Sequence, residues 1–267
     1  MRDLQNEEKD FLFEVDVVGV ENIKVPMQID SLLQPKIQST IVTFTLGARL
    51  SQFAKGTNMS RFVVALEKYR LDNQLLSIPS LRKLAVDLTE ELEQNEIKIH
   101  VSFPWFYERK APISTFSAMN HSQVDISLNY HQKEGFSHEV SLTSSVTTLC
   151  PCSKEISEYS AHNQRGEVKI TAHISEVLDE NIDWKVSLLN AIESNASSKL
   201  FPILKRPDEK IVTETAYENP RFVEDLARLV AADLCEYDWI SSFTVKCKNQ
   251  ESIHLHDAVA TIHYNRS

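Results

Sequence analysis

The stretch Ile97-Lys98-Ile99-His100-Val101-Ser102-Phe103 alternates strictly between apolar and polar side chains. Successive side chains of a β-strand point to opposite faces, so this pattern predicts a strand that is buried on one face. Val124–Tyr130 alternates in the same way. The two stretches therefore predict two half-buried strands.

Helices and further strands flank this pair. Leu81, Leu84, Leu88 and Leu92 recur at helical spacing, and Ser60 is placed to cap an earlier helix. Helices are predicted from Ser60 onward and at about 79–94, 186–200 and 219–236. Strands are predicted at about 40–50, 138–149, 167–176, 239–247 and 255–264. Hairpins beside helix pairs favour an α+β fold with antiparallel sheets.

The helix at 219–236 is predicted to begin at Asn219-Pro220, with a cap residue followed by proline at the first helical position. Its apolar stripe comprises Phe222, Leu226 and Leu229, widened by Val223, Ala227, Val230 and Leu234.

Composition excludes several classes of protein. The net charge of −10 argues against a nucleic-acid binder that relies on bulk electrostatics. Five scattered glycines form neither a GxGxxG nor a GxxxxGK[ST] motif, which disfavours Rossmann and P-loop sites. No apolar run approaches the roughly 18 residues of a membrane helix, and the acidic first residues are unlike a secretory signal. Four cysteines do not suggest a disulfide framework, so we expect a cytoplasmic protein.

The densest reactive chemistry lies between Cys150 and Gly166, where Cys152, Lys154, His162 and Arg165 also occur. A thiolate and an imidazole on one crossover loop suit a metal ion or a nucleophile–base pair. A four-thiolate site is disfavoured because the other two cysteines lack a paired spacing. The alternative is that both thiols are small residues buried at a strand end.

Three other segments carry candidate groups. The charged run from Lys205 to Lys210 is either a solvated loop or a carboxylate flanked by cations that suits metal or phosphate. Glu224 either complements a helix dipole or accepts hydrogen bonds from a donor-rich base edge such as that of guanine. His254 and His256, on a predicted strand, are either structural or suited to proton transfer or phosphate contact.

Seven ordered motifs, spanning residue 40 to the end, together resemble the type IB GTP cyclohydrolases, a family with the tunnelling fold. They are Lys55–Phe62, Val101–Pro104, Leu149–Ser157, Ala161–Arg165, Leu204–Lys210, Tyr217–Asp225 and Ser252–His256.

The resemblance implies that GTP is hydrolysed at C8 to give formate and 7,8-dihydroneopterin triphosphate, which opens tetrahydrofolate synthesis. It also implies two ββαα modules with helices packed on one face of antiparallel sheets, and a homotetramer with active sites at subunit interfaces. On this basis residues 1–35 are an N-terminal extension, 36–135 the first module and 136–267 the second, which carries most site residues. No nucleic-acid or membrane partner is expected.

By position, the resemblance makes Cys150, His162 and Glu209 the ligands of one divalent ion per site, Zn, Mn or Fe. Cys150, His254 and His256 are the implied catalytic residues, the two histidines serving proton transfer, and Glu224 anchors guanine. The implied triphosphate contacts are Arg61, Lys154, Arg165, Lys205 and Arg206. Cys152 is assigned a supporting part, and Asn58 stands where some relatives have histidine. Two alternatives stay open: a tunnelling-fold relative that stops at a cyclic phosphate, and a noncatalytic purine-binding module.

Overall fold

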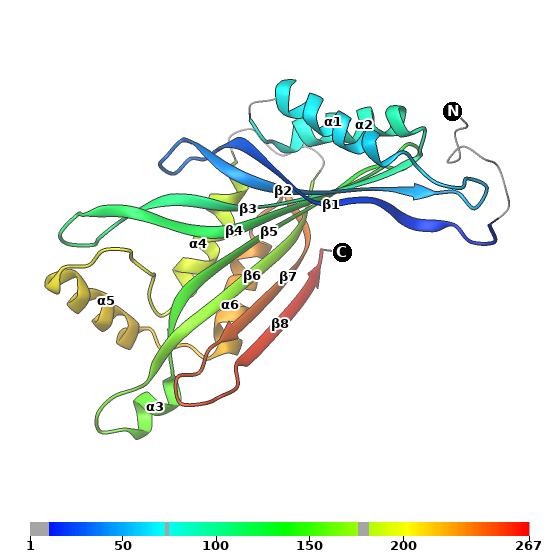
Figure 1. The fold of residues 1–267 in the computed structure, drawn as a ribbon. Coiled ribbons are helices and arrows are strands. Elements are labelled where there is room, and N and C mark those ends of the chain that lie inside the picture. Colours follow the sequence, from blue (N-terminus) through cyan, green and yellow to red (C-terminus); the bar gives the residue numbers. More distant parts are fainter. Residues whose placement is uncertain (1–10, 73–74, 176–181, 267) are drawn as a thin grey trace. The chain divides into compact units, whose positions relative to one another are not determined.

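A computed structural model describes residues 11–72, 75–175 and 182–266. Its eight strands form one sheet in sequence order, from β1 to β8, as Figure 1 shows. Strand β1 pairs antiparallel with β2, β2 with β3, β6 with β7, and β7 with β8. The predicted α+β class with an antiparallel sheet is therefore confirmed.

The strands are β1 Val15–Asp30, β2 Ile37–Leu50, β3 Glu96–Lys110, β4 Ser117–His131, β5 Gly135–Leu149, β6 Asn163–Ile174, β7 Ile240–Asn249 and β8 Ala258–Asn265. The helices are α1 Met59–Asp72, α2 Ile78–Leu92, α3 Pro151–Ile156, α4 Trp184–Asn195, α5 Arg206–Glu218 and α6 Val223–Cys235. None of the helices in the described ranges combines the length and the apolar character that spanning a membrane requires.

The chain divides into two compact units. Unit 1 comprises the described residues up to Asp30 together with Ile37–Pro104 and Asp125–Glu139, and unit 2 comprises Ser31–Lys36, Trp105–Val124 and Val140 onward. The module boundary at residues 135 and 136 stays a prediction.

Unit 1 has the core that the alternating stretch predicts. Ile97, Ile99 and Val101 are buried, and they lie opposite buried residues of β2 in the antiparallel register. The predicted leucine face of α2 is buried as well. This helix begins with a reciprocal cap, since Ser77 Oγ accepts from the backbone N–H of Ser80 and Ser80 Oγ accepts from that of Ser77.

The segment that the sequence analysis assigns to an N-terminal extension contains strand β1, Val15–Asp30. β1 pairs with β2 from Val15 to Asp30, and its side chains at Val25, Met27 and Ile29 are buried. Register shifts between Val15 and Val18 and between Val20 and Ile23 interrupt the period-two pattern. The strand is therefore hard to see in the sequence, although it is an integral part of the sheet. The first ten residues of the predicted extension lie outside the described residues.

Unit 2 holds α4 and α6 next to each other, and α6 packs on β7 and β8. Asp183 caps the start of α4, and its carboxylate accepts hydrogen bonds from the backbone N–H of Lys185 at 3.1 Å and of Leu32 at 2.8 Å. Burial raises the pKa of Asp183, but the Lys185 charge and these hydrogen bonds lower it below its usual range overall.

Two predicted helix starts are wrong, one in each half of the chain. The helix predicted to begin at Asn219-Pro220 begins at Val223, because Asn219 ends α5 instead. In its stripe, Phe222 and Leu229 are exposed, whereas the five other predicted residues are buried. In the first half, α1 begins at Met59, so the predicted cap Ser60 lies inside the helix.

Candidate functional site

The loop between β5 and β6 brings Cys150 next to His162. Cys150 follows the last residue of β5 and precedes α3, whose first residue is Pro151, so the strand ends where the sequence predicts. The backbone N–H of Cys150 donates to the carbonyl oxygen of His162 at 3.2 Å. A residue outside this loop also fixes the end of β5, because Ser197 Oγ accepts a hydrogen bond from the Leu149 N–H at 3.0 Å. Cys150 and His162 therefore sit side by side on a well-anchored edge.

The imidazole of His162 faces two oxygen acceptors. Its Nδ1 lies 2.9 Å from Oε1 of Gln164 and 3.9 Å from Oε2 of Glu251. Gln164 in turn contacts the hydroxyl of the fully buried Thr148 through Nε2, at 3.1 Å. The His162 and Glu251 side chains are only 15% and 16% exposed, so solvent only weakly screens the field of a carboxylate at the imidazole.

The β7–β8 loop, not a strand, carries His254 and His256, which corrects the predicted strand at 255–264. Their rings stack with centroids 4.8 Å apart and planes at 16°. The same loop presents Glu251 to His162. Sequence reasoning did not select Glu251, because only the pairing of β6 with β7 brings it near His162.

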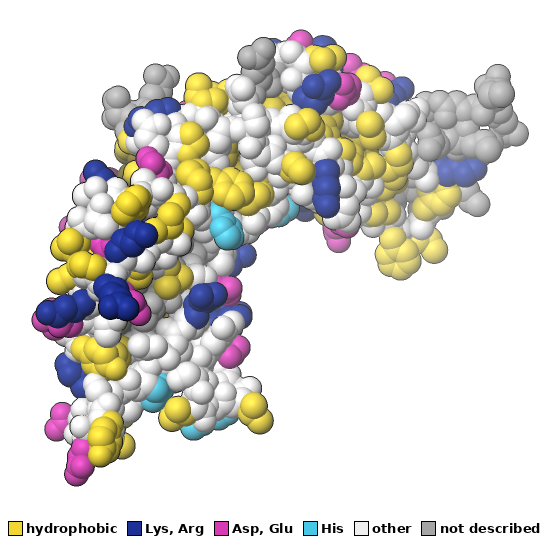
Figure 2. Space-filling view, turned by 60° about the vertical axis from the view of Figure 1, so that its left-hand side comes forward, with side chains coloured by type: hydrophobic (Ala, Val, Ile, Leu, Met, Phe, Trp, Pro, Cys, Tyr) yellow, Lys and Arg dark blue, Asp and Glu magenta, His cyan; other side chains and the backbone are white. Residues whose placement is uncertain are grey.

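Exposed apolar side chains surround this end of unit 2. Figure 2 shows histidine and hydrophobic side chains at the lower end of the view, where Figure 1 places α3 and the β7–β8 loop. Ile156 is 82% exposed, Tyr159 is 95% exposed, and Ile253 and Leu255 are exposed as well. Exposed apolar side chains therefore occur in both segments that approach His162, the β5–β6 connection and the β7–β8 loop.

Glu209 lies in the first turn of helix α5. One of the two sequence-based interpretations of this segment is a solvated loop. Its neighbour Asp208 is fully buried and accepts four hydrogen bonds. Oδ1 accepts from the backbone N–H groups of Ile113 and Ser114, both at 2.8 Å. Oδ2 accepts from Ser114 Oγ at 2.6 Å and from the Lys205 N–H at 2.8 Å. Burial raises the pKa of Asp208, but these bonds hold it well below its usual range. Asp208 therefore clamps the start of α5 to the β3–β4 loop, and Glu209 itself stays exposed.

The predicted ligand set is only partly assembled within one chain. In the parts of the chain that the structure describes, no three His, Cys, Asp or Glu side chains gather closely enough to hold a metal ion. Cys150 and His162 adjoin each other, whereas Glu209 does not join them. A thiolate and a neutral imidazole are donors that suit a borderline divalent ion, so the chemistry of the pair fits the implied metal.

Glu224 lies in the first turn of α6, as predicted, and borders a shallow hollow of about 280 Å³. Phe222, Asp225 and Arg228 complete its lining, and Arg228 Nη1 lies 3.6 Å from Asp225 Oδ1. The exposed carboxylate of Glu224 is therefore available to a ligand, next to an aromatic ring that is 40% exposed.

The fold is shared with urate oxidases. Urate oxidase from Bacillus sp. TB-90 has a TM-score of 0.57 at 9% identity, covering 94% of this chain and 100% of that chain. Uricase from Arthrobacter globiformis has a TM-score of 0.53 at 10% identity, covering 94% of each chain. At such identities the likeness concerns the fold alone, and it confirms the predicted tunnelling fold.

Sequence similarity then decides the family. Residues 1–260 match the family model for type I GTP cyclohydrolase folE2. The chain belongs to this family. GTP cyclohydrolase FolE2 from Oceanobacillus iheyensis is 54% identical over 268 residues, covering 100% of this chain and 89% of that protein. The FolE2 proteins of Halalkalibacterium halodurans and Bacillus subtilis are 53% and 48% identical, covering 100% of this chain and 89% and 88% of those proteins.

In this folE2 family chain, the cations predicted to bind triphosphate have different surroundings. Arg61 belongs to unit 1 and donates through Nη1 to the carbonyl oxygen of Glu91 at 2.7 Å, near the end of α2. In unit 2, Lys154 donates to the carbonyl oxygen of Tyr217. Lys205 Nζ lies 5.2 Å from the centre of the Phe116 ring. Arg165 and Arg206 are exposed. Their common role toward triphosphate stays a prediction.

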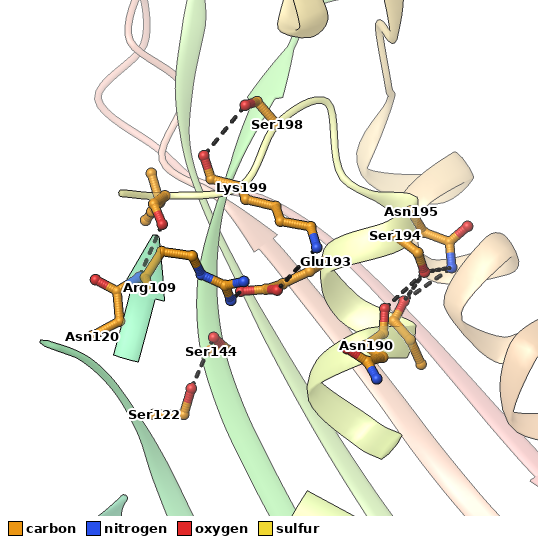
Figure 3. A network of polar contacts seen from close by, with 12 residues as sticks. Arg109, Asn120, Ser122, Ser144, Asn190, Glu193, Ser194, Asn195, Ser198 and Lys199 are labelled. Atoms are coloured by element: carbon orange, nitrogen blue, oxygen red, sulfur yellow. Dashed lines mark hydrogen bonds and ion pairs between the residues drawn. The ribbon is translucent and has the colours of Figure 1, made fainter. Parts of the chain in front are cut away.

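Unit 2 also contains an ion cluster that the sequence did not indicate. Arg109 of β3 pairs with Glu193 of α4, whose side chain is only 3% exposed. Lys199 Nζ approaches the same carboxylate at 3.5 Å. Figure 3 shows the Arg109 and Lys199 side chains converging on Glu193 from two sides. The cluster joins a strand to a helix through a buried carboxylate.

Proposed function

We propose that the chain is a GTP cyclohydrolase of the type IB class. It converts GTP and water to 7,8-dihydroneopterin triphosphate and formate, the first step of tetrahydrofolate biosynthesis. Membership of the folE2 family supports this activity. The structural observation that supports this activity is that Cys150 and His162 lie next to each other, where β5 ends and β6 begins.

Cys150, His162 and Glu209 would hold one divalent ion, Zn, Mn or Fe. Such an ion, when bound, lowers the pKa of a water molecule and so supplies hydroxide at neutral pH for attack at C8 of the purine. The chain's own groups then orient the substrate and move protons. Glu224 accepts hydrogen bonds from N1–H and the N2 amino group of guanine. His254 and His256 serve proton transfer, and Arg61, Lys154, Arg165, Lys205 and Arg206 contact the triphosphate.

The complete site forms in a cytoplasmic homotetramer, with Glu209 supplied across a subunit interface. Two observations support this arrangement. Glu209 does not join Cys150 and His162 among the described residues of one chain. The exposed apolar residues beside that pair, including Tyr159 and Leu255, would be buried by a second copy.

The test is to incubate the purified protein with GTP and either Zn²⁺, Mn²⁺ or Fe²⁺. We expect stoichiometric formate and, after oxidation, a fluorescent neopterin. Cys150→Ala should abolish turnover, whereas the matched control Cys235→Ala, in helix α6, should retain it. A protein that yields no formate with any of these ions contradicts the proposal.

The two alternatives have different outcomes in the same assay. Mass spectrometry of the product distinguishes a triphosphate from a cyclic phosphate. A noncatalytic purine-binding module would bind GTP without releasing formate, and Cys150→Ala would leave its GTP affinity nearly intact.

A further inference from the structure

A short chain of hydrogen bonds runs from the sheet to the imidazole of His162. Thr148 of β5 is fully buried and Gln164 of β6 is 8% exposed. The Gln164 amide bridges the Thr148 hydroxyl, at 3.1 Å, and His162 Nδ1, at 2.9 Å. Gln164 lies in strand β6, and its hydrogen bond to Thr148 of β5 fixes its amide against the sheet. The same amide therefore fixes the position of His162 Nδ1.

These two hydrogen bonds alone permit two arrangements. A threonine hydroxyl and a neutral imidazole each donate or accept, so the amide of Gln164 could present either its oxygen or its nitrogen to His162. Glu251 decides between them. Its Oε2 lies 3.9 Å from the same Nδ1 atom, and both side chains are largely buried. A carboxylate facing Nδ1 favours a proton there and opposes a lone pair, because like charges repel in a weakly screened site. The Gln164 oxygen therefore faces Nδ1–H, and its nitrogen donates to Thr148.

We propose that Gln164 is a positioning residue that holds neutral His162 in the Nδ1–H tautomer. This tautomer leaves the lone pair on Nε2. A histidine that binds a metal through one ring nitrogen almost always donates the other N–H to a neighbouring group, which fixes the ring orientation. The use of Nε2 as a ligand atom rests on the proposed function, whereas the tautomer itself is a property of the metal-free chain.

The test measures the tautomer directly. Protein with ¹⁵N-labelled histidine is prepared free of metal, and the His162 ring signals are assigned by their loss in His162→Asn. We expect two-bond nitrogen–proton correlations to show Nδ1–H in the natural protein. Gln164→Leu removes both hydrogen bonds and should populate the Nε2–H tautomer. Gln164→Glu keeps an oxygen acceptor toward His162 and should retain Nδ1–H.

Metal affinity provides the second readout, by calorimetric titration of the metal-free protein with Zn²⁺ or Mn²⁺. Loss of an outer partner of a ligand histidine typically weakens metal binding about 10–100-fold, so Gln164→Leu should fall in that range and Gln164→Glu should stay within a few-fold. The matched control is Thr171→Val, which removes another β5–β6 hydrogen bond, that of Ser141 Oγ with Thr171 Oγ1 at 2.6 Å. It should leave the tautomer and the affinity unchanged.

Two results overturn the inference: an Nε2–H tautomer in the natural protein, or an unchanged His162 tautomer in Gln164→Leu. Equal losses of metal affinity in Gln164→Leu and Thr171→Val would also overturn it, since they indicate a general weakening of the sheet. Failure of the proposed function looks different. In that case the natural protein releases no formate from GTP, while the NMR signals of the metal-free chain still report the tautomer.

Discussion

The pair of Arg109 and Glu193 allows a quantitative test of how unit 2 is held together. Their side chains are 16% and 3% exposed, and in the described part of the chain Arg109 Nε has no hydrogen-bond partner. Glu193→Ala would leave the Arg109 charge buried without its partner. Removing one partner of a buried pair costs about 3–5 kcal/mol of folding free energy. For a chain of this size, that corresponds to a melting temperature lower by about 6–20 °C.

Two further variants separate the buried charge from the loss of contacts. Lys199→Met should cost less than about 1 kcal/mol, because the Lys199 side chain is 42% exposed and its pairing is screened by solvent. Arg109→Met combined with Glu193→Leu removes both buried charges and keeps much of the volume. That double variant should recover most of the stability lost in Glu193→Ala.

The free energy of unfolding is measured by urea titration followed by circular dichroism, at one fixed protein concentration since subunit association shifts apparent stability. The reasoning is refuted if Glu193→Ala loses no more than Lys199→Met. It is also refuted if the double variant loses as much as the single variants Arg109→Met and Glu193→Leu added together, because that result shows no coupling between the two side chains.

The remaining predictions concern other elements. Glu224→Gln should reduce kcat/KM for GTP about 10–150-fold, since a hydrogen bond to a charged acceptor contributes about 1.5–3 kcal/mol. The steady-state rate of formate release measures kcat/KM, and unchanged kinetics would exclude the guanine contact. Asp183→Ala should cost about 0.5–2 kcal/mol through loss of the α4 cap, measured by urea unfolding. Because the pKa of Asp183 is lowered by folding, its contribution is complete above the unfolded value near 3.8 and is lost as the pH falls through the folded one, so the two proteins should converge in acid. Gly19→Ala should strongly destabilise the β1–β2 pair, because an added Cβ would lie 1.9 Å from the Leu46 carbonyl oxygen. A melting temperature equal to that of the natural protein would show that β1 is dispensable.

Elements with a regular apolar period could be predicted from the sequence. β3 and α2 bury the residues that their patterns indicate, because each has one face in the core and one face outside. α5 could not be found in this way. Of its thirteen residues only Asp208 and Ala216 are buried, so it has no apolar stripe. The strand predicted at about 255–264 begins only at Ala258, and the apolar residues beside His254, Ile253 and Leu255, are exposed in a loop.

The candidate site shows the same limit. The position of Cys150 at a strand end follows from the sequence around Pro151. The approach of Glu251 to His162 depends on the register between β6 and β7, in which Gly166 lies opposite Asn249. A register of this kind joins residues more than eighty positions apart, and local patterns contain no information about it.

The clamp around Asp208 has a consequence for the residue that follows it. Backbone N–H groups donate to both carboxylate oxygens of Asp208, so an asparagine there would point its amide hydrogens at one or more backbone N–H donors in either orientation. Consecutive helical residues are rotated by about 100° around the axis, which turns Glu209 away from the β3–β4 loop. Within the described residues, the Asp208 carboxylate thus satisfies backbone donors of its own chain, whereas the exposed Glu209 side chain makes no such contact. Two adjacent residues of similar chemistry should therefore differ in their tolerance to exchange: a substitution at 208 should destabilise the fold, whereas one at 209 should leave its stability nearly unchanged.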